Sequence, residues 1–313
     1  MVALITVDIG GTSMRAAAYP SNSINHLSHN KISTEKSKSK VFENLVGLIR
    51  SVWPDNAEVA AISVAFAGPL DPKTGFIFDA PNIPEWKDFP LGDKLSEVFP
   101  IPVFIGNDAN LAAVGEWKYG AGVGHSDLIY LTISTGIGGG IISNNQLLEG
   151  YNGLAAELGH ITVQPDGAIC PCGKKGHLEA LSSGQAIVDY VRQMLLAGKE
   201  SILDLEKNIS AYDIALAARN GDDLAISAYD HAGFYLGQAI ASFIHIFNPS
   251  IIILGGGVAN SGSLLFDPVI KKIKIDVMDP IYLKNLVIVP AKLGDDAGLV
   301  GALVVARQKL QIS

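Results

Sequence analysis

The same local pattern occurs twice in this sequence: a short apolar run that predicts a buried strand is followed at once by a cluster of glycines. The first copy is residues 2–8 followed by Ile-Gly-Gly-Thr, and the second is residues 127–134 followed by Thr-Gly-Ile-Gly-Gly-Gly. Glycines after a strand let the backbone turn tightly and leave N–H groups free to face an anion. Because 313 residues exceed the usual size of one hydrophobic core, we expect two lobes and a cleft. Each lobe would present one glycine turn, and the two turns could hold one phosphate chain between them.

Strand-like and helix-like hydrophobic patterns alternate along the chain, which indicates an α/β protein. The predicted strands are 2–8, 14–20, 28–34, 59–67, 101–105, 127–134, 250–254 and 286–289. The predicted helices are 41–53, 109–117, 184–196, one or more within 211–247, and 297–308. We place the lobe boundary near Trp117, with the last helix crossing back. Residues 1–117 and 297–313 would then form a small lobe, and residues 118–296 a large one.

Charge and composition argue against several classes of protein. The net charge is −8, and beyond one short lysine run there is no basic patch of the kind that binds nucleic acid or anionic lipid. We therefore expect no nucleic-acid partner and no membrane partner. No uncharged run of 18 residues predicts a membrane span, and the N-terminus lacks the basic region of a signal peptide. Two cysteines are too few for a disulfide-stabilised secreted domain, so we expect a cytoplasmic location.

The first glycine turn combines a carboxylate with groups that could bind an anion. Gly10 and Gly11 free backbone N–H groups and Thr12 adds a hydroxyl, whereas the carboxylate of Asp8 would repel a phosphate. The carboxylate makes sense if a cation such as Mg²⁺ lies between it and the phosphate. A plain hairpin turn with a glycine pair is the alternative interpretation.

Two further glycine clusters fit a nucleotide. Residues 134–140 contain four glycines, more than a hairpin needs, and they match neither a Walker A loop nor the spacing of a Rossmann fingerprint. We interpret them as a second phosphate turn. Residues 255–257 are three glycines after a predicted strand, and they would let a flat ring approach the backbone. A flexible loop is the alternative for these three residues.

Asn107 and Asp108 lie between a predicted strand and a predicted helix. Both residue types suit a helix N-cap. A carboxylate at the carboxyl end of a strand also lies where α/β sheets bind ligands. We expect the helix N-terminus to lower the pKa of Asp108 and so to make it a weak base. Phosphoryl transfer tolerates a weak base, because its loose transition state needs the base mainly to orient the hydroxyl.

Four potential metal ligands lie close together in the sequence: His160, Cys170, Cys172 and His177. Two imidazoles and two thiolates suit a four-coordinate Zn²⁺ with no open position, so this metal would be structural. The alternative is two buried cysteines and two surface histidines. Glu157 and Glu179 flank the cluster, and a rigid knuckle over residues 160–179 could hold both carboxylates where they accept hydrogen bonds from sugar hydroxyls.

Taken together, these motifs resemble those of the ROK family of sugar kinases, within the actin/hexokinase-like superfamily. They are D-I-G-G-T (8–12), A-G-P (67–69), A-P-N (80–82), N-D-A-N (107–110), T-G-I-G-G-G (135–140), E-L-G-H (157–160), C-P-C-G-K-K-G-H-L-E (170–179) and L-G-G-G-V (254–258). The resemblance runs from Asp8 to about Arg307. It implies an α/β fold of two actin-like, ribonuclease H-like lobes that close on ATP and a sugar in the cleft between them.

The resemblance also implies roles for individual residues. Asp108 would be the catalytic base on the sugar hydroxyl, and His160 would bind both zinc and sugar. The implied sugar ligands are Asn82, Asn107, Asp108, Glu157, His160 and Glu179. The implied ligands of ATP with Mg²⁺ are Asp8, Gly10, Gly11, Thr12, Thr135, Gly136, Gly138, Gly139, Gly255, Gly256 and Gly257. The implied ligands of structural Zn²⁺ are His160, Cys170, Cys172 and His177.

The sequence departs from the family pattern at three positions. His177 stands where the family has a third cysteine, so the zinc site either survives with two histidines and two cysteines or is weakened. Ser134 stands where glycine is common. Ala156 precedes Glu157 where glycine is usual, which could shift the sugar-binding loop.

The expected reaction is ATP-dependent phosphorylation of the 6-hydroxyl of a hexose, with glucose as the first candidate. N-acetylmannosamine, N-acetylglucosamine and fructose are alternative substrates, because the pocket depends on loops whose shape the sequence does not give. A sugar-binding regulator is the non-enzymatic alternative. Repressors of this family carry a helix-turn-helix domain ahead of the first glycine turn, which begins here at Asp8, so we expect an enzyme. The resemblance further implies a homodimer.

Overall fold

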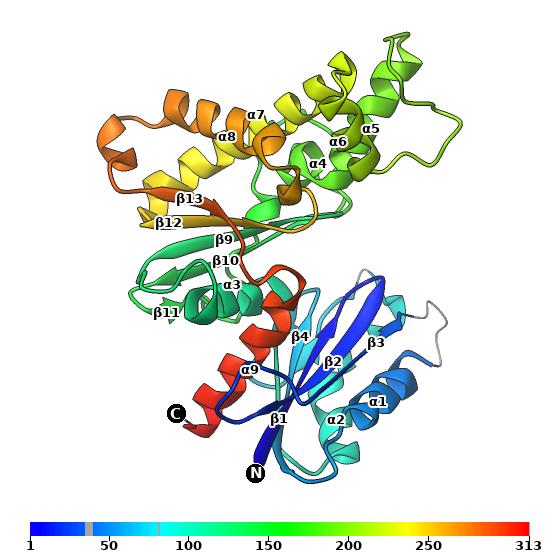
Figure 1. The fold of residues 1–313 in the computed structure, drawn as a ribbon, viewed down its shortest axis with the longest axis vertical. Helices are drawn as coiled ribbons and strands as arrows, with labels where there is room; N and C mark the ends of the chain where they lie inside the picture. The colour runs from blue at the N-terminus through cyan, green and yellow to red at the C-terminus, as the bar shows by residue number, and fades with distance from the viewer. Residues whose placement is uncertain (35–39, 81, 313) are drawn as a thin grey trace.

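Two five-stranded sheets with the same topology form the framework of the computed structural model, which describes residues 1–34, 40–80 and 82–312 (Figure 1). The strand orders are β3-β2-β1-β4-β8 and β11-β10-β9-β12-β13. In each sheet the central strand is antiparallel to its hairpin partner, β2 or β10, and parallel to the strand on its other side, β4 or β12. The repeated strand-and-glycine pattern therefore corresponds to the two central strands, β1 and β9.

The strands are β1 (Val2–Ile9), β2 (Ser13–Pro20), β3 (Ser28–Ser33), β4 (Glu58–Phe66), β5 (Leu70–Asp71), β6 (Phe76–Ile77), β7 (Phe89–Pro90), β8 (Val103–Asn107), β9 (Leu128–Ile133), β10 (Ile137–Ser143), β11 (Gln146–Leu147), β12 (Ile251–Gly255) and β13 (Val287–Pro290). The α-helices are α1 (Val41–Ser51), α2 (Leu91–Val98), α3 (Asp108–Tyr119), α4 (Glu179–Ser182), α5 (Gly184–Leu196), α6 (Ala211–Arg219), α7 (Asp223–Phe247), α8 (Ser263–Asp276) and α9 (Ala297–Leu310). All predicted strands and helices are present, with ends shifted by a few residues. The sequence analysis missed β10, β11, α2, α4, α8 and the small sheet of β5, β6 and β7.

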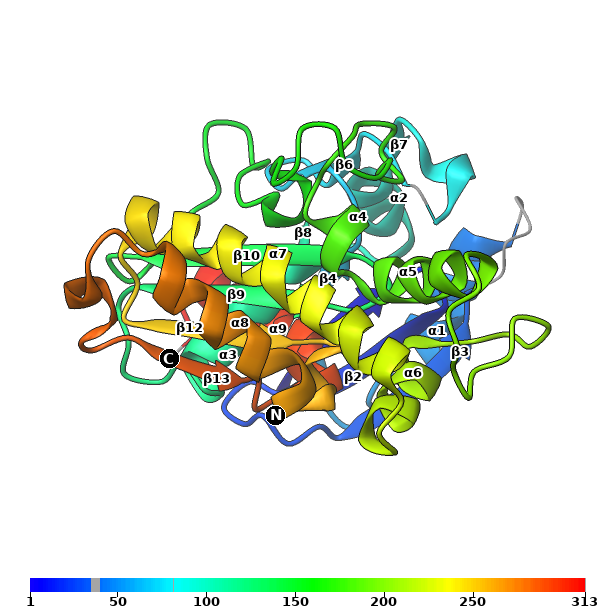
Figure 2. The ribbon, with the colours of Figure 1, turned by 90° about the horizontal axis from the view of Figure 1, so that it is seen from above.

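Helices cover both faces of each sheet. Helices α1 and α2 pack on one face of the first sheet, and α9 packs on β1 and β4. Helix α3 packs on β9 and β10 of the second sheet and also against α9, so these two helices lie between the sheets (Figure 1). The other face of the second sheet is covered by a layer in which the long helix α7 contacts α4, α5, α6 and α8 (Figure 2).

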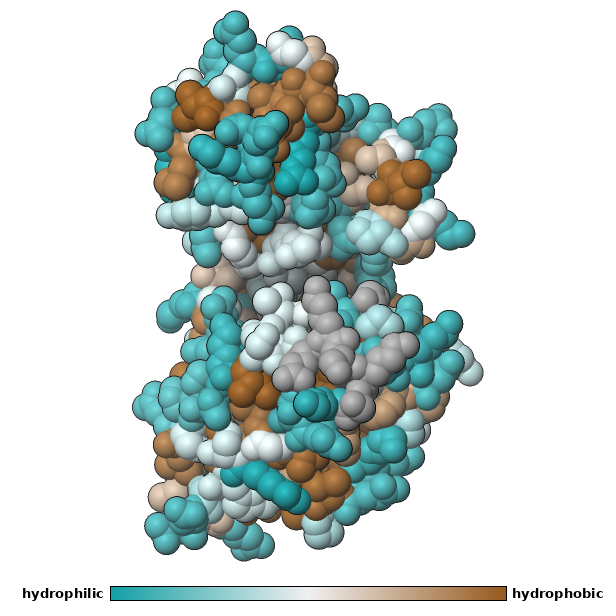
Figure 3. All heavy atoms as spheres, turned by 90° about the vertical axis from the view of Figure 1, so that its right-hand side faces the viewer, coloured by the Kyte–Doolittle hydropathy of each residue, from teal (hydrophilic) through white to brown (hydrophobic). Residues whose placement is uncertain are grey.

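The two largest hydrophobic clusters lie one in each half of the molecule, and smaller clusters lie around α3 and α9. Of the two largest, one gathers around β1 and β4 with α1, and the larger one gathers around β9, β10 and β12 with α5 to α8. Between the two halves the molecule narrows to a waist, and many of the residues at its centre on the face in Figure 3 are neither strongly hydrophobic nor strongly hydrophilic. The carboxyl ends of the central strands β1 and β9 lie close to the junction of the halves (Figure 1).

The mixed α/β architecture is confirmed, whereas the assignment of residues to a small and a large lobe stays a prediction. Pro81 of the A-P-N motif and Ser313 of the C-terminal segment lie outside the described residues. In the part of the chain that the structure describes, no helix has both the length and the apolar character needed to span a membrane.

Candidate functional site

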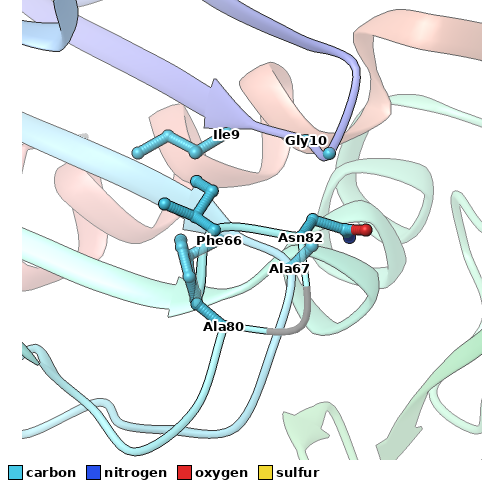
Figure 4. Close-up of a pocket in the computed structure, with 8 residues that line it drawn as sticks. Ile9, Gly10, Phe66, Ala67, Ala80 and Asn82 are labelled. Carbon is cyan, nitrogen blue, oxygen red and sulfur yellow. The ribbon is translucent and has the colours of Figure 1, made fainter. Parts of the chain in front are cut away.

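The first glycine turn follows β1 and is closed by a backbone hydrogen bond from the N–H of Gly10 to the carbonyl of Ser13 (3.1 Å). Gly11 lies so close to the Asn82 side chain that a Cβ at this position would clash with it. A small hollow beside the turn is lined by Ile9, Gly10, Gly11, Phe66, Ala67, Ala80, Asn82 and Ile83 (Figure 4). Thr12 is exposed next to it. The structure thus brings the D-I-G-G-T motif together with Ala80 and Asn82.

Asp8 at the end of β1 forms an ion pair with Arg15, which lies opposite it on β2. Arg15 also donates to the carbonyl of Asp295 (2.6 Å) and lies 3.8 Å from the carboxylate of Asp296. Burial raises the pKa of Asp8, and the positive charge of Arg15 opposes this shift. The sequence analysis missed Arg15. The signal was available, because a residue soon after a tight turn lies opposite a residue just before it.

Of the neighbours Asn107 and Asp108, both of which could cap the following helix by residue type, only Asn107 does so. Asn107 is the N-cap of α3, and its side-chain oxygen accepts a hydrogen bond from the N–H of Asn110 (3.1 Å). Asp108 is the first residue of the helix, and its carboxylate accepts a hydrogen bond from the N–H of Ala109 (2.8 Å). The carboxylate of Asp108 is therefore free of the capping role.

The prediction that the helix N-terminus lowers the pKa of Asp108 is wrong. Burial of the carboxyl group, together with the nearby negative charge of Asp8, raises its pKa to about 7. The hydrogen bond from the N–H of Ala109 acts in the opposite direction but does not outweigh burial. A carboxylate with this pKa is a better proton acceptor near neutral pH than an ordinary aspartate.

The second glycine cluster is only partly a turn. Residues 134–136 connect β9 to β10, and the three glycines that follow, Gly138, Gly139 and Gly140, lie within β10. The prediction of one long turn is therefore wrong beyond its third residue. A Cβ at Gly139 would lie 2.6 Å from Leu158, and a Cβ at Gly140 would lie 2.6 Å from Ala113 of α3. These glycines let neighbouring elements pack directly on the strand.

The third glycine cluster lies beside the second. Gly255 ends β12, and Gly256 adopts a left-handed conformation with φ +84°. No atom lies within 4 Å of the place where Gly257 would carry a Cβ, so a flat group has room there. The N–H of Val258 donates to the carbonyl of Ile133 (3.0 Å), which fixes this turn against the end of β9.

The four potential metal ligands come together in space. Every pair of ligand atoms from His160, Cys170, Cys172 and His177 lies within 4.8 Å. The distance is 3.6 Å from Cys170 Sγ to His160 Nδ1 and 3.2 Å from Cys172 Sγ to His177 Nδ1. Ligand atoms around a tetrahedral zinc, with bonds of about 2.0–2.3 Å, are about 3.3–3.8 Å apart. The donor set fits one zinc ion with no open position, and the two spacings given are close to those of a tetrahedral site.

The two glutamates beside this cluster differ in their contacts. Glu157 is exposed and precedes the short 3-10 helix η2 (Leu158–His160). Glu179 begins α4, and its Oε2 accepts a hydrogen bond from the N–H of Ile137 (2.9 Å). Ala156 adopts a left-handed conformation with φ +67°, which explains why glycine suits this position better.

Comparisons with known proteins show which family this sequence and fold belong to. The chain matches the ROK family over residues 4–309. It is 34% identical over 313 residues to a glucokinase of Thermotoga maritima, covering 98% of each protein. A solved ROK family glucokinase from Streptomyces griseus, in complex with glucose and AMPPNP, is 36% identical and superposes with a TM-score of 0.85, covering 98% of this chain and 99% of that one.

A transcriptional regulator shares the fold as well. A solved ROK family regulator, a homologue of the Escherichia coli MLC protein, is 29% identical and superposes with a TM-score of 0.88, covering 98% of this chain and 78% of that one. The α/β fold of two actin-like lobes is thus common to kinases and regulators with this architecture. Because the family match covers nearly the whole sequence, the chain belongs to the ROK family.

Proposed function

We propose that this protein is an ATP-dependent hexokinase that transfers the γ-phosphoryl group of ATP to the 6-hydroxyl of glucose. The observation that carries the proposal is the carboxyl group of Asp108, which has a pKa of about 7 and lies near Asp8 of the first glycine turn. The similarity to glucokinases over almost the full length supports ATP as donor and glucose as acceptor. N-acetylmannosamine, N-acetylglucosamine and fructose are the alternative acceptors.

In the proposed reaction Asp108 orients the 6-hydroxyl and accepts its proton. A new bond forms between the sugar oxygen and the γ-phosphorus as the bond to the bridging oxygen breaks, which releases ADP. The raised pKa helps this step, because it lets the carboxylate hold the transferred proton at neutral pH. Closure of the two halves around the substrates would exclude water, which competes with the sugar for the phosphoryl group.

The other site residues bind the substrates in this proposal. Around the sugar lie Asn82, Asn107, Glu157, His160 and Glu179. Around the nucleotide lie Asp8, Gly10, Gly11, Thr12, Thr135, Gly136, Gly138, Gly139, Gly255, Gly256 and Gly257. The open space over Gly257 supports its place beside the adenosine. Gly138 and Gly139 lie in β10, so they support the turn by close packing as much as by contact with phosphate.

Two metal ions belong to the proposal. Mg²⁺, when bound with ATP near Asp8, would neutralise charge that develops on the phosphate oxygens. Zn²⁺ would be held by His160, Cys170, Cys172 and His177, and the spacing of these ligands supports that site. His160 would join the zinc site to the sugar pocket. The homodimer and the cytoplasmic location stay predictions.

The test is release of ADP from Mg·ATP on addition of sugar, measured for the purified protein across a panel of hexoses. We expect turnover with glucose, and a loss of at least about 10²-fold in kcat for Asp108→Asn, the lower end for removal of a general base. Asp93→Asn changes an exposed carboxylate of α2 and should leave kcat unchanged. Near wild-type turnover by Asp108→Asn would contradict its role, and sugar binding without ADP release would favour a regulator instead.

A further inference from the structure

Glu179 connects three parts of the proposed site through one side chain. Its Oε2 accepts the N–H of Ile137, the first residue of β10 after the second glycine turn (2.9 Å). Its Oε1 lies 3.5 Å from Sγ of Cys170, a potential metal ligand. The rest of the residue begins α4, directly after the metal-binding knuckle. The carboxylate thus bridges the knuckle and the turn that would hold the phosphates.

The second glycine turn is shaped to receive this carboxylate. A Cβ at Gly136 would clash with Oε2 of Glu179, so only a glycine leaves room for the contact. The carboxylate accepts the N–H of Ile137, which is consequently not available to the nucleotide. The contact therefore orients the turn rather than binding the phosphate itself.

On the opposite side of the turn, the hydrogen bonds within the described residues are between backbone groups. The N–H of Gly184 donates to the carbonyl of Ser134 (2.7 Å), and the N–H of Val258 donates to that of Ile133 (3.0 Å). Both bonds belong to the scaffold of the second sheet and its helices. Glu179 supplies the side-chain contact to the turn, and it comes from the side of the sugar and the metal.

We infer that Glu179 is a positioning residue for the nucleotide turn, in addition to its proposed part in binding sugar. Through it, the sugar pocket and the metal knuckle are coupled to nucleotide affinity. The inference rests on the proposed function, because it takes residues 134–136 as the phosphate turn. It predicts that a change at Glu179 weakens nucleotide binding even when no sugar is present, which a residue that only binds sugar would not do.

The experiment measures the Kd of Mg·AMPPNP without sugar, and the Kd of glucose without nucleotide, by isothermal titration calorimetry. Glu179→Ala removes the acceptor of the Ile137 N–H, and we expect the nucleotide Kd to rise about tenfold, as for loss of one hydrogen bond to a charged group. Glu179→Gln keeps a carbonyl oxygen for that N–H, so its nucleotide Kd should stay within about threefold of wild type. Both variants should bind glucose more weakly.

Three further variants separate the turn from the sugar pocket. Gly136→Ala leaves Glu179 intact but pushes the carboxylate off the turn, so it should also raise the nucleotide Kd. Because Gly136 is itself placed at the nucleotide, Glu179→Asp, whose shorter side chain withdraws the acceptor from the Ile137 N–H, decides the matter if Glu179→Ala does not fold. Glu157→Gln is the matched control, a neighbouring glutamate whose loss should weaken glucose binding and leave the nucleotide Kd unchanged. Metal analysis of each variant accompanies the titrations.

The outcomes distinguish the inference from the proposed function. If the wild-type protein binds neither AMPPNP nor glucose, the proposed function fails. If it binds both, and the nucleotide Kd of Glu179→Ala and Gly136→Ala equals that of wild type, the positioning role is wrong. A rise in nucleotide Kd for Glu157→Gln as large as for Glu179→Ala would also overturn it, because the effect would then follow from any loss of charge in the sugar pocket.

Discussion

At the scale of single residues, opposing influences on one carboxyl group decide its chemistry. The helix N-terminus favours the charged form of Asp108, whereas burial and the charge of Asp8 favour the neutral form, and the pKa rises to about 7. A base must be deprotonated to act, so we expect kcat/KM to fall about tenfold for each pH unit below 7 and to level off above it. The measurement is a pH–rate profile of the wild-type protein. A flat profile between about pH 5.5 and 8 would show that Asp108 titrates outside this pH range.

Stability gives a second readout of the same titration. The pKa of Asp108 is about 7 in the folded protein, against an ordinary value of 3.8. Between about pH 3.8 and pH 7 the carboxyl group keeps its proton in the folded protein and loses it in the unfolded chain. The stability that this group contributes is therefore present at low pH and is lost as the pH rises through about 7. Asp108→Asn does not titrate. Its melting temperature relative to wild type should therefore be higher at pH 8 than at pH 5.

The site residues differ in how far the sequence could predict them. His160 and His177 could be grouped with the two cysteines because all four lie within a short loop, where spacing in sequence constrains distance in space. The pKa of Asp108 could not be predicted, because it depends on burial between segments far apart in the chain. Arg15 was overlooked for a simpler reason: an arginine on a strand usually reads as a solvated side chain, and its ion pair depends on the register of the hairpin.

At the scale of elements, glycine sets how closely α3 and α9 pack. Gly301 of α9 lies against the backbone carbonyl of Leu111 in α3, and a Cβ there would clash with it. We expect Gly301→Ala to lower the free energy of unfolding by about 2 kcal/mol, because the helices must move apart. Gly47 of α1 is the matched control, since it is exposed and nothing lies within 4 Å of its missing Cβ.

Gly47→Ala should be neutral or stabilising by up to about 1 kcal/mol, the usual gain in an exposed helix. Urea denaturation of both variants measures the difference. Equal and small effects at both positions would mean that the α3–α9 contact is not tight. Glycine and proline also explain why the sequence did not predict two of the elements: Gly138 to Gly140 obscured strand β10, and Pro268 inside α8 obscured that helix. In both places tertiary packing overrides local preference.

At the scale of the whole molecule, one buried carboxylate accepts hydrogen bonds from two chain connections near the junction of the halves. The side chain of Glu116 near the end of α3 is fully buried. Its Oε2 accepts the N–H of Ala121, in the connection from α3 to β9 (2.7 Å), and its Oε1 accepts the N–H of Leu293, in the connection from β13 to α9 (2.7 Å). Without the carboxylate each backbone N–H would lose this partner at a partly buried position, which is costly.

Glu116→Gln tests this link, because an amide keeps one acceptor oxygen and turns the other into a donor that faces a backbone N–H. We expect the free energy of unfolding to fall by about 2 kcal/mol, the contribution of one hydrogen bond to a charged group. Glu97→Gln, at an exposed position of α2, should change it by less than about 0.5 kcal/mol. Urea denaturation with an unchanged slope measures both. If Glu116→Gln unfolds at the wild-type urea concentration, the two connections are held by their backbone packing, and the carboxylate adds nothing to the junction of the halves.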